Sequence, residues 1–330
     1  MISRALVVLC LLAPATYAAE AKKLCVYDPS GANGDIFNLS KDYKTAAVGW
    51  GVEFTAKPYT DERTAAEDFK AGQCDAVVLT GVRARGFVNF AGSIEALGAL
   101  ANYDQLETVI KSLASPKGGA LMKGAEYQSL AIMPAGSVWL FLRDRNIDSV
   151  SKLAGKRIAT IDFDDAAKVM VKTVGGSMVA ADIGTFAGMF NNGSVDAAYA
   201  PSGAYRALEL YKGVGKTGGV VKYVLSQLTF QVVAKSSAFP DDFATKSRQW
   251  AADNFSRFRA VVDKADKAIP AEQWVAVPPD QVKKYDEVFQ KVRLQLRDES
   301  KVYDKSMLTL LRKVRCKADA ARGECAEAKE

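Results

Sequence analysis

The sequence contains no histidine among its 330 residues. Serine and cysteine nucleophiles in catalytic triads need an imidazole as their base, and many metal sites need one as a ligand. The absence therefore excludes Ser-His-Asp and Cys-His catalysis and histidine-ligated metals. We predict no enzyme activity, no metal site and no cofactor, and a hydrolase that uses Asp162 and Asp164 is the one catalytic alternative left open.

Long apolar runs are also missing. The apolar stretch at residues 5–15 is about eleven residues long, whereas a membrane-spanning helix needs roughly 20. It follows Arg4 and precedes the small residues Thr16 and Ala18, which is the pattern of a cleavable signal peptide. We predict a signal peptide at residues 1–19 and a periplasmic mature protein. Cys10 lies inside this segment without the neighbours of a lipid-anchoring cysteine, so we expect no lipid anchor.

Cysteine is scarce, with five residues in the whole sequence. Removal of the signal peptide leaves Cys25, Cys74, Cys316 and Cys325, and an even number in an oxidising compartment favours two disulfides. Cys316 and Cys325 flank a short polar segment that can close locally. For Cys25 and Cys74, two buried free thiols remain an alternative, because cysteine is often a core residue.

Neither sign of charge dominates the sequence. It has 44 basic and 38 acidic residues, and removal of the signal peptide takes away one arginine, so the net charge falls from +6 to +5. The basic residues are interspersed with acids, for example in the segments 283–287 and 297–299. Such a mixture is typical of a solvated surface. We therefore predict no nucleic-acid partner, and we expect a monomer.

The mature sequence alternates strand and helix patterns. A strand at 23–28 ends in a cluster of turn residues, a second is expected at 51–59, and a helix pattern then runs from the capping Thr60 to Gly72. A buried strand at 74–81 completes a βαβ unit, and such units build parallel sheets covered by helices. Further strands are predicted at 129–134, 137–144, 157–161, 177–182, 195–200 and 228–236.

The C-terminal third has a helical pattern. One amphipathic helix is predicted at 241–265. A long helix is predicted at 278–316, where Pro278 and Pro279 mark its start and a break is expected near Ser300. No linker rich in proline or serine separates the two halves of the chain, so strands rather than a flexible tether must cross any domain boundary.

One spacing occurs twice, in the form F-x-x-G-x-x-D-A. The first copy is Phe69, Gly72, Asp75 and Ala76, and the second is Phe190, Gly193, Asp196 and Ala197. In each copy we expect phenylalanine to pack a helix on a sheet, glycine to end that helix with a positive φ, and alanine to begin a buried strand. Duplication and shared packing rules both explain the pattern, and both indicate two α/β lobes.

Three carboxylates gather in the segment TIDFDDAA. Asp162, Asp164 and Asp165 lie between the carboxyl end of a predicted strand and the start of a helix. Open α/β sheets bind ligands at such ends, and aspartate is also a favoured residue in a first helical turn. Helix capping and contact with an amine or hydroxyl ligand therefore both remain open.

Two segments resemble the substrate-binding subunits of tripartite ATP-independent periplasmic (TRAP) transporters. The strand signature L-x-G-x-K-I-R of that family is matched in part by Leu153, Gly155, Arg157 and Ile158. Its segment L-x-x-G-x-V-D-x-x-x-x-P is matched by Phe190, Gly193, Val195, Asp196 and Pro201. Residues 68–81 and 228–243 resemble further elements of these proteins. The resemblance covers most of the mature chain.

The resemblance implies an α/β, two-lobed periplasmic-binding-protein fold of type II, also called a Venus flytrap, with long C-terminal helices. Its lobes close on a small solute, typically an organic acid, and membrane subunits then receive the solute. We assign the parts of the chain accordingly: lobe I at 22–135 and 229–262, lobe II at 136–228 and 263–290, a long C-terminal helix at 291–315 that packs on the lobes, and a polar tail at 316–330.

The sequence departs from the family at two places that bear on the ligand. The arginine that clamps carboxylates in the family is replaced here by Ala159, and alanine cannot form its paired hydrogen bonds. Around Tyr199 the usual ligand-contacting residues are replaced by alanines. Other cations available for the role are Arg83, Arg85, Arg143 and Arg145. The predicted ligand-binding residues are Tyr27, Asp28, Thr80, Arg83, Trp139, Thr160, Asp162, Tyr199 and Ser202.

We therefore predict an exported solute-binding protein that captures a small polar molecule between two lobes and delivers it to integral membrane transporter subunits. An exported sensor or interaction protein with the same fold, and with no role in transport, is the alternative from another functional class.

Overall fold

The computed structural model describes residues 19–330. The predicted signal peptide up to residue 18, together with Cys10, lies outside the described residues. Within them, no helix is both long and apolar enough to cross a membrane.

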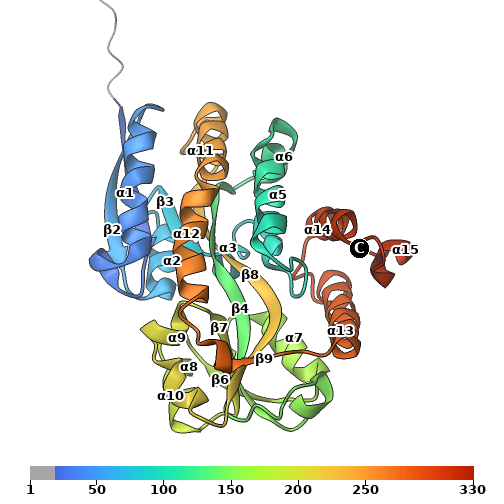
Figure 1. The fold of residues 1–330 in the computed structure, drawn as a ribbon. Coiled ribbons are helices and arrows are strands. Elements are labelled where there is room, and N and C mark those ends of the chain that lie inside the picture. The colour runs from blue at the N-terminus through green and yellow to red at the C-terminus, as the bar shows by residue number, and fades with distance from the viewer. Residues whose placement is uncertain (1–18) are drawn as a thin grey trace, which may run out of the picture.

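Two long strands connect the two lobes of the molecule. β4 (Tyr127–Leu142) has 16 residues and β8 (Gly219–Lys235) has 17, and they pair antiparallel along most of their length. Both extend through the upper and the lower lobe in Figure 1, in opposite directions. One sheet therefore passes through both lobes, with the strand order β2-β1-β3-β8-β4-β7-β5-β6 and with β9 (Trp274–Val275) beside β8.

The upper lobe in Figure 1, lobe I, contains three parallel strands and the N-terminal helices. The central strand β1 pairs in parallel with β2 and β3, and β3 pairs antiparallel with β8. The elements of this lobe are β1 (Glu20–Tyr27), η1 (Gly31–Asn33), α1 (Asp35–Val48), β2 (Val52–Tyr59), α2 (Glu62–Lys70), β3 (Ala76–Thr80), α3 (Gly81–Ala84), α4 (Asn89–Gly92), η2 (Ser93–Glu95), α5 (Tyr103–Ala114) and α6 (Pro116–Leu121).

The lower lobe, lobe II, repeats this arrangement. β5 lies between β6 and β7 and pairs in parallel with both, and β7 pairs antiparallel with β4. The elements are η3 (Val150–Leu153), β5 (Arg157–Ile161), α7 (Asp165–Thr173), β6 (Ser177–Ala181), α8 (Phe186–Asn192), β7 (Ala197–Pro201), α9 (Ala204–Ala207) and α10 (Leu210–Val214).

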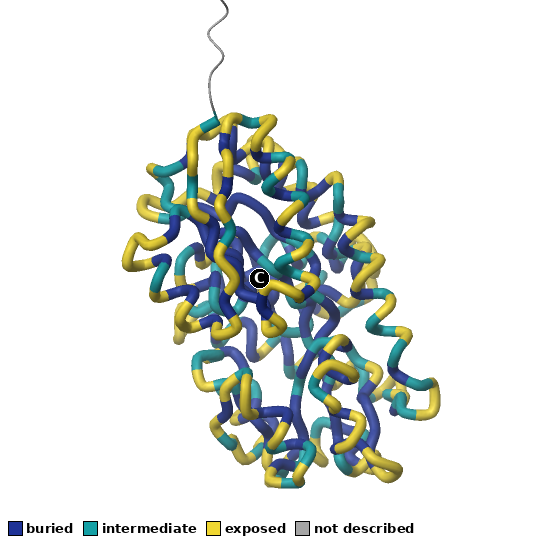
Figure 2. The backbone as a smooth tube through the Cα atoms, turned by 90° about the vertical axis from the view of Figure 1, so that its left-hand side faces the viewer, coloured by how far each residue is buried: buried dark blue, intermediate teal, exposed yellow. Residues whose placement is uncertain are grey.

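The remaining helices return to both lobes. α11 and α12 pack on β4, α13 contacts α7 in lobe II, and α14 contacts α5 in lobe I. Their bounds are α11 (Asp241–Asp253), α12 (Phe255–Asp266), η4 (Ala271–Gln273), α13 (Pro279–Asp298), α14 (Lys305–Ala318) and α15 (Gly323–Glu327). Figure 2 shows that buried backbone lies inside both lobes and that exposed segments lie on their outer surfaces.

Three element predictions need correction. The segments 129–134 and 137–144 are one strand, β4, whose register shifts between Pro134 and Gly136; such a bulge lets a strand accommodate proline. The strand predicted at 228–236 begins earlier, at Gly219. The helix predicted at 241–265 is two helices, because Asn254 donates a side-chain hydrogen bond to the Trp250 carbonyl (2.9 Å) and leaves helical geometry.

The break expected near Ser300 is confirmed, since α13 ends at Asp298 and α14 begins at Lys305. The predicted C-terminal helix at 291–315 is therefore not continuous but contains the end of one helix and most of the next.

The two F-x-x-G-x-x-D-A segments play the same part in the two lobes. Phe69 and Phe190 are fully buried, and Gly72 and Gly193 have φ of 78° and 85°. Each aspartate accepts a hydrogen bond from a backbone N–H of the neighbouring strand: Asp75 from Lys23 (2.7 Å) and Asp196 from Arg157 (2.9 Å). The shared spacing thus reflects one solution to the junction of a helix with a parallel strand.

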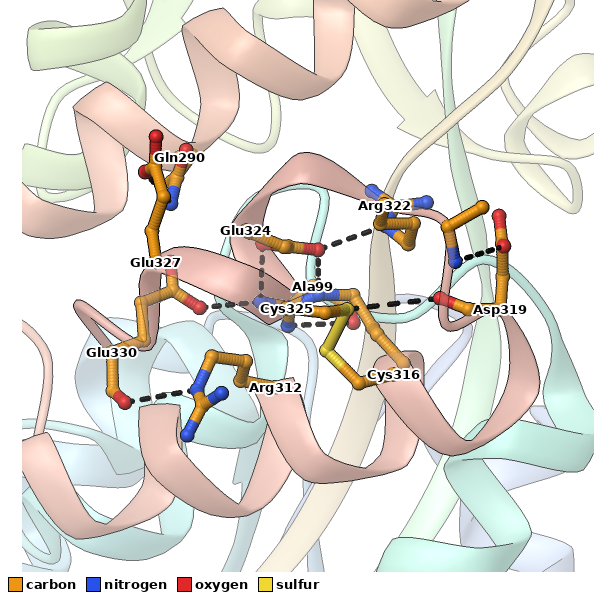
Figure 3. The surroundings of a disulfide bond; sticks show 12 residues. Ala99, Gln290, Arg312, Cys316, Asp319, Arg322, Glu324, Cys325, Glu327 and Glu330 are labelled. Atoms are coloured by element: carbon orange, nitrogen blue, oxygen red, sulfur yellow. Dashed lines mark hydrogen bonds and ion pairs between the residues drawn. A yellow bond between two sulfur atoms is a disulfide. The ribbon is translucent and has the colours of Figure 1, made fainter.

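Both predicted disulfides are present. Cys25 is bonded to Cys74 and Cys316 to Cys325. The first joins β1 to the start of β3, two strands that also pair directly. The second closes the short segment between α14 and α15 (Figure 3). The alternative of free buried thiols at Cys25 and Cys74 is therefore wrong.

The C-terminal segment was expected to be a polar tail, yet two of its carboxylates are buried. Glu324 pairs with Arg293 (2.8 Å) and Arg315 (2.7 Å), and Glu330 pairs with the same two arginines. Figure 3 shows Glu324 and Glu330 beside the disulfide. Arg293 and Arg315 also donate to the backbone carbonyls of Leu97 and Ala99 in lobe I. The tail thus fastens the last helices to lobe I.

Loss of Glu324 should destabilise the fold. Burial by itself raises the pKa of Glu324, but hydrogen bonds and charge interactions with Arg315 lower it from 4.5 to about 2. We expect Glu324→Gln to lower the free energy of unfolding by about 3 kcal/mol, because it leaves buried guanidinium charge unpaired. Urea denaturation measures this loss, and Glu327→Gln, which changes an exposed carboxylate of the same segment, is the control.

The effect of Glu324 should also depend on pH. Since its pKa is lower in the folded state, its stabilisation is fully present above about pH 4.5 and is lost as the pH falls toward about 2. The difference between wild type and Glu324→Gln should therefore shrink in acid. A difference that stays constant across this range would contradict the assignment.

Candidate functional site between the lobes

A cavity of about 480 Å³ lies between the lobes. Lobe I contributes the carboxyl ends of β1 and β3 and the segments that follow them, and lobe II contributes the corresponding ends of β5 and β7. This is the position at which α/β sheets bind ligands, and the volume is in the range of small-molecule sites. Residues from β4, β8, α7 and α13 complete the lining.

Four polar side chains of the lining surround the boundary between the lobes. Arg85 follows α3 in lobe I, and its Nη2 lies 3.6 Å from Oδ1 of Asp164 in lobe II. The guanidinium also lies 5.3 Å from the ring centre of Tyr303, between α13 and α14. The fourth residue is Glu95 of η2, whose pKa is affected by the charges of both Arg85 and Asp164.

Glu95 is held by one oxygen only. Its Oε1 accepts hydrogen bonds from the backbone N–H and the hydroxyl of Thr229, at 2.5 and 2.7 Å. Its Oε2 is buried and has no hydrogen-bond partner, and the same is true of Nη1 of Arg85. Gly81 makes room for this carboxyl, because a Cβ there would lie 2.1 Å from Oε1. Burial raises the pKa of Glu95 from 4.5 to about 8, so the side chain carries a proton at neutral pH.

Three neighbouring residues of lobe II meet three arginines of lobe I. Asp162 pairs with Arg63 (3.2 Å), the ring of Phe163 lies 3.8 Å from the guanidinium carbon of Arg83, and Asp164 pairs with Arg85. We call these six residues the clasp. Glu62 fixes Arg83 through Nε (3.1 Å). The clasp joins the lobes beside the cavity.

Asp164 serves two purposes in this arrangement. It is the N-cap of α7 and accepts from the backbone N–H of Ala167 (3.3 Å), and it also faces Arg85. The capping alternative for the segment TIDFDDAA is therefore realised by Asp164. Contact of these carboxylates with an amine or hydroxyl ligand stays a prediction.

The structure places four of the nine predicted ligand-binding residues in the cavity lining: Tyr27, Asp28, Thr80 and Tyr199. The Tyr199 hydroxyl accepts a hydrogen bond from the backbone N–H of Ile161 (3.0 Å), so it also holds the end of β5. Asp28 accepts from the N–H groups of Ser30 and Phe37 and thereby supports the loop before α1.

The other five do not line the cavity. Arg83 and Asp162 belong to the clasp, and the Thr160 hydroxyl donates to the carbonyl of Ile158 (3.0 Å). Trp139 donates to the Ser202 hydroxyl (2.8 Å), and Ser202 donates to Asp266, which also accepts from Tyr103. Trp139 and Ser202 thus support Asp266, and the bond from Tyr103 to Asp266 connects the two lobes at a different place.

Of the four arginines considered as replacements for the missing clamp, one lines the cavity. Arg143 donates to the carbonyls of Phe190 and Asn191, and Arg145 donates to that of Glu272. Arg83 is paired with Glu62. Arg85 is the one that lines the cavity, and only 9% of it is exposed.

Two residues of the polar group escaped the sequence analysis. Tyr303 lies in the break between α13 and α14, and although that break was expected, nothing in the sequence marked Tyr303 as a site residue. Glu95 stands alone in the apolar segment 90–100, and an isolated acid among buried residues is the one signal that pointed to it. In the part of the chain that the structure describes, no group of three or more Cys, Asp or Glu side chains is arranged to hold a metal ion.

The raised pKa of Glu95 should make stability depend on pH. A carboxyl with a higher pKa in the folded state stabilises the fold fully below about pH 4.5 and loses this effect as the pH rises through about 8. We expect Glu95→Gln to remove that loss, so that the variant gains stability relative to wild type between these values. Urea denaturation across this range tests it, with exposed Glu67→Gln as the control; equal slopes would show that Glu95 is not protonated in the folded protein.

Comparison with known proteins gives a consistent result. The model of the family described as "Solute-binding protein AdeT 1/2" matches residues 44–330. The probable solute-binding protein AdeT1 of Acinetobacter baumannii is 36% identical over 301 residues, which cover 91% of this chain and 99% of AdeT1. AdeT2 of the same organism is 24% identical over 234 residues, covering 71% of this chain and 98% of AdeT2.

Solved structures with low sequence identity show the same fold. A TRAP periplasmic solute-binding protein from Ralstonia eutropha, with bound acetolactate, has a TM-score of 0.71 at 15% identity and covers 90% of this chain and 99% of its own. One from Shewanella oneidensis, with bound succinate, has a TM-score of 0.68 at 10% identity, with the same coverage. The two-lobed fold implied by the resemblance is therefore confirmed, and the chain belongs to the AdeT 1/2 family of solute-binding proteins.

Proposed function

We propose that this protein is exported to the periplasm, captures a small molecule in the cavity between its lobes, and delivers it to integral membrane transporter subunits without changing it chemically. The observation that carries the proposal is the cavity of about 480 Å³ lined by both lobes in a member of a solute-binding family. The bound small molecules of the Ralstonia and Shewanella proteins support it, because they belong to proteins with the same fold.

We further propose that the lobes divide at residues 135–136 and 228–229 and move about these points. The register of β4 and β8 shifts between Pro134 and Gly136, which lie opposite Thr229 and Leu228. Gly136 has a φ of 122°, a value that residues with a side chain rarely adopt. Irregular pairing at this level supports a hinge, since fewer regular hydrogen bonds resist bending there.

The clasp gives closure a physical basis in this proposal. Its contacts lie between groups on opposite lobes, so they form only when the lobes approach. Asp162 and Arg63 are exposed, and such pairs contribute only about 0.2–1 kcal/mol each. This exposed pair therefore opens at little cost, and a solute that contacts both lobes adds energy that keeps them closed.

Blocking the cavity should abolish solute binding without harming the fold. Gly203 lines the cavity, has φ of −56°, and a Cβ there would meet no atom within 4 Å. A solute at a hundred times its dissociation constant stabilises the wild type by about 2.7 kcal/mol. We expect Gly203→Trp to lose this stabilisation in a thermal-shift panel of organic acids, amino acids, sugars, polyamines and apolar amides.

Gly188→Trp is the matched control, because Gly188 is also exposed on lobe II with open space at its Cβ but does not line the cavity. Equal shifts in wild type and Gly203→Trp would place the binding site elsewhere. If no compound of the panel shifts the melting temperature of the wild type, the result would argue against capture of a solute and would favour a sensor or interaction role for the same fold.

Reversal of one clasp charge should weaken any solute that the panel identifies. Asp162→Arg places two cations face to face and opposes closure, and the double variant Arg63→Asp with Asp162→Arg restores an attractive pair. We expect the single variant to lose about threefold to fivefold in affinity and the double variant to recover most of it, in line with an exposed ion pair. Calorimetry measures the affinity of both variants. If the double variant loses the sum of the affinity losses of the two single variants, the two residues do not act together across the lobes.

A further inference from the structure

The cavity lining has an apolar part and a polar end. The apolar part runs into lobe II between α7, α13 and the sheet, where α7 presents one face to it. Its main residues are Leu140, Leu153, Ile158, Met170, Val171 and Val174. The polar end, at Arg85, Glu95 and Asp164, lies at the lobe boundary. Unlike the organic acid implied by the resemblance, a molecule with an apolar body suits this lining.

The volume sets the size of that body. An engineered cavity of about 150 Å³ lined by apolar side chains stays dry and binds benzene. The cavity here, at about 480 Å³, has roughly three times that volume. Small residues at Ala166, Ala167, Ala200 and Ala204 contribute to this space. A chain or ring system of about ten heavy atoms, buried at about 25 cal/mol per Å² of apolar surface, would bind by that burial.

Two polar atoms at the polar end have no hydrogen-bond partner. Nη1 of Arg85 and Oε2 of Glu95 are buried without partners, and buried polar atoms are normally paired. Since Oε1 of Glu95 accepts two hydrogen bonds from Thr229, the proton of the neutral carboxyl belongs on Oε2. Both groups are therefore donors on residues that line the cavity. The two atoms are closed off in this structure, so an acceptor oxygen on a bound molecule meets them once the two side chains turn toward it.

The charges of the lining argue against an anionic ligand. Its charged and acidic residues are Asp28, Asp35, Glu95, Asp164 and a single cation, Arg85. Arg85 already faces Asp164. A ligand carboxylate at Arg85 would lie beside that aspartate, and two like charges about 4 Å apart repel strongly in a protein interior. Ala159 offers no second cation to offset this.

We propose that the cavity takes an uncharged, largely apolar molecule whose polar end, an amide or other carbonyl or hydroxyl oxygen, accepts hydrogen bonds from Arg85 and Glu95. The proposal rests on the proposed capture of a solute between the lobes and names the chemical class of that solute. The apolar body lies against α7, and the acceptor oxygen occupies the polar end without displacing Asp164 from Arg85.

The test compares probes that share one apolar chain and differ at its end. Calorimetry on the mature wild-type protein at about pH 7 would use octanamide, octanol, octanoate, octylammonium and succinate. We expect octanamide and octanol to bind at least about tenfold more tightly than octanoate, which corresponds to about 1.4 kcal/mol. We expect no heat from succinate. Tighter binding of octanoate or succinate than of octanamide would overturn the proposal, as would tighter binding of octylammonium.

Variants of the two donors test the polar end. Glu95→Leu should weaken octanamide by about tenfold, because it removes a buried donor. Glu95→Gln keeps a donor in that place, so its affinity should not change with pH. Wild-type affinity should fall above about pH 8, where Glu95 loses its proton beside Arg85, Asp164 and Tyr303. The control is Asp165→Asn, an exposed carboxylate that does not line the cavity.

The outcomes separate this proposal from the proposed function. If acids or sugars bind and Gly203→Trp blocks them, capture between the lobes stands and the apolar, uncharged class is wrong. If octanamide binds equally well to wild type and Glu95→Leu at every pH, the assignment of the polar end is wrong. If no probe of any class binds to the wild type, both proposals fail.

Discussion

The antiparallel pairing of β4 and β8 fixes the geometry on which the site depends. Because both strands continue from one lobe into the other, a single sheet carries the parallel strands of both lobes. The carboxyl ends of β1 and β3 then face those of β5 and β7 across one space. Loops that follow parallel strands carry the polar groups of α/β proteins, and here they supply the cavity lining and the clasp. The pairing of the two strands shifts register at three places, between Ser129 and Ala131, between Pro134 and Gly136, and between Val138 and Leu140.

The sequence was sufficient for the parts of the fold that follow from local rules. Alternation of strands and helices, glycine at helix ends and the F-x-x-G-x-x-D-A spacing predicted two parallel α/β lobes, because each lobe must solve the same junction of helix and strand. Elements that depend on tertiary contact were missed. Asn254 breaks a helix without glycine or proline, and Pro134 stays within a strand because a bulge opposite β8 accommodates it.

The sequence predicted which strand ends lie near the candidate site, but not which side chains point into the cavity. Strand ends pointed to Tyr27, Thr80 and Tyr199, which line the cavity, and also to Thr160 and Ser202, which do not. Successive side chains of a strand point to opposite faces, so a choice between Thr160 and Ile161 needs the register of neighbouring strands. Glu95 and Tyr303 were harder to predict, because packing between elements that are remote in sequence brings each of them to the cavity. The burial of the tail carboxylates Glu324 and Glu330 was missed for the same reason.

Closure and selectivity share one residue in this molecule. Arg85 pairs with Asp164 across the lobe boundary, and among the described residues it is also the only arginine or lysine in the cavity lining. A ligand carboxylate that competes for this guanidinium weakens the contact between the lobes at the moment it binds. A neutral acceptor that uses Nη1, the atom without a partner, leaves that contact in place. Discrimination between the two kinds of solute then follows from the energy of closure itself, because among the described residues lobe II contributes no arginine or lysine to the cavity lining that could relieve the competition.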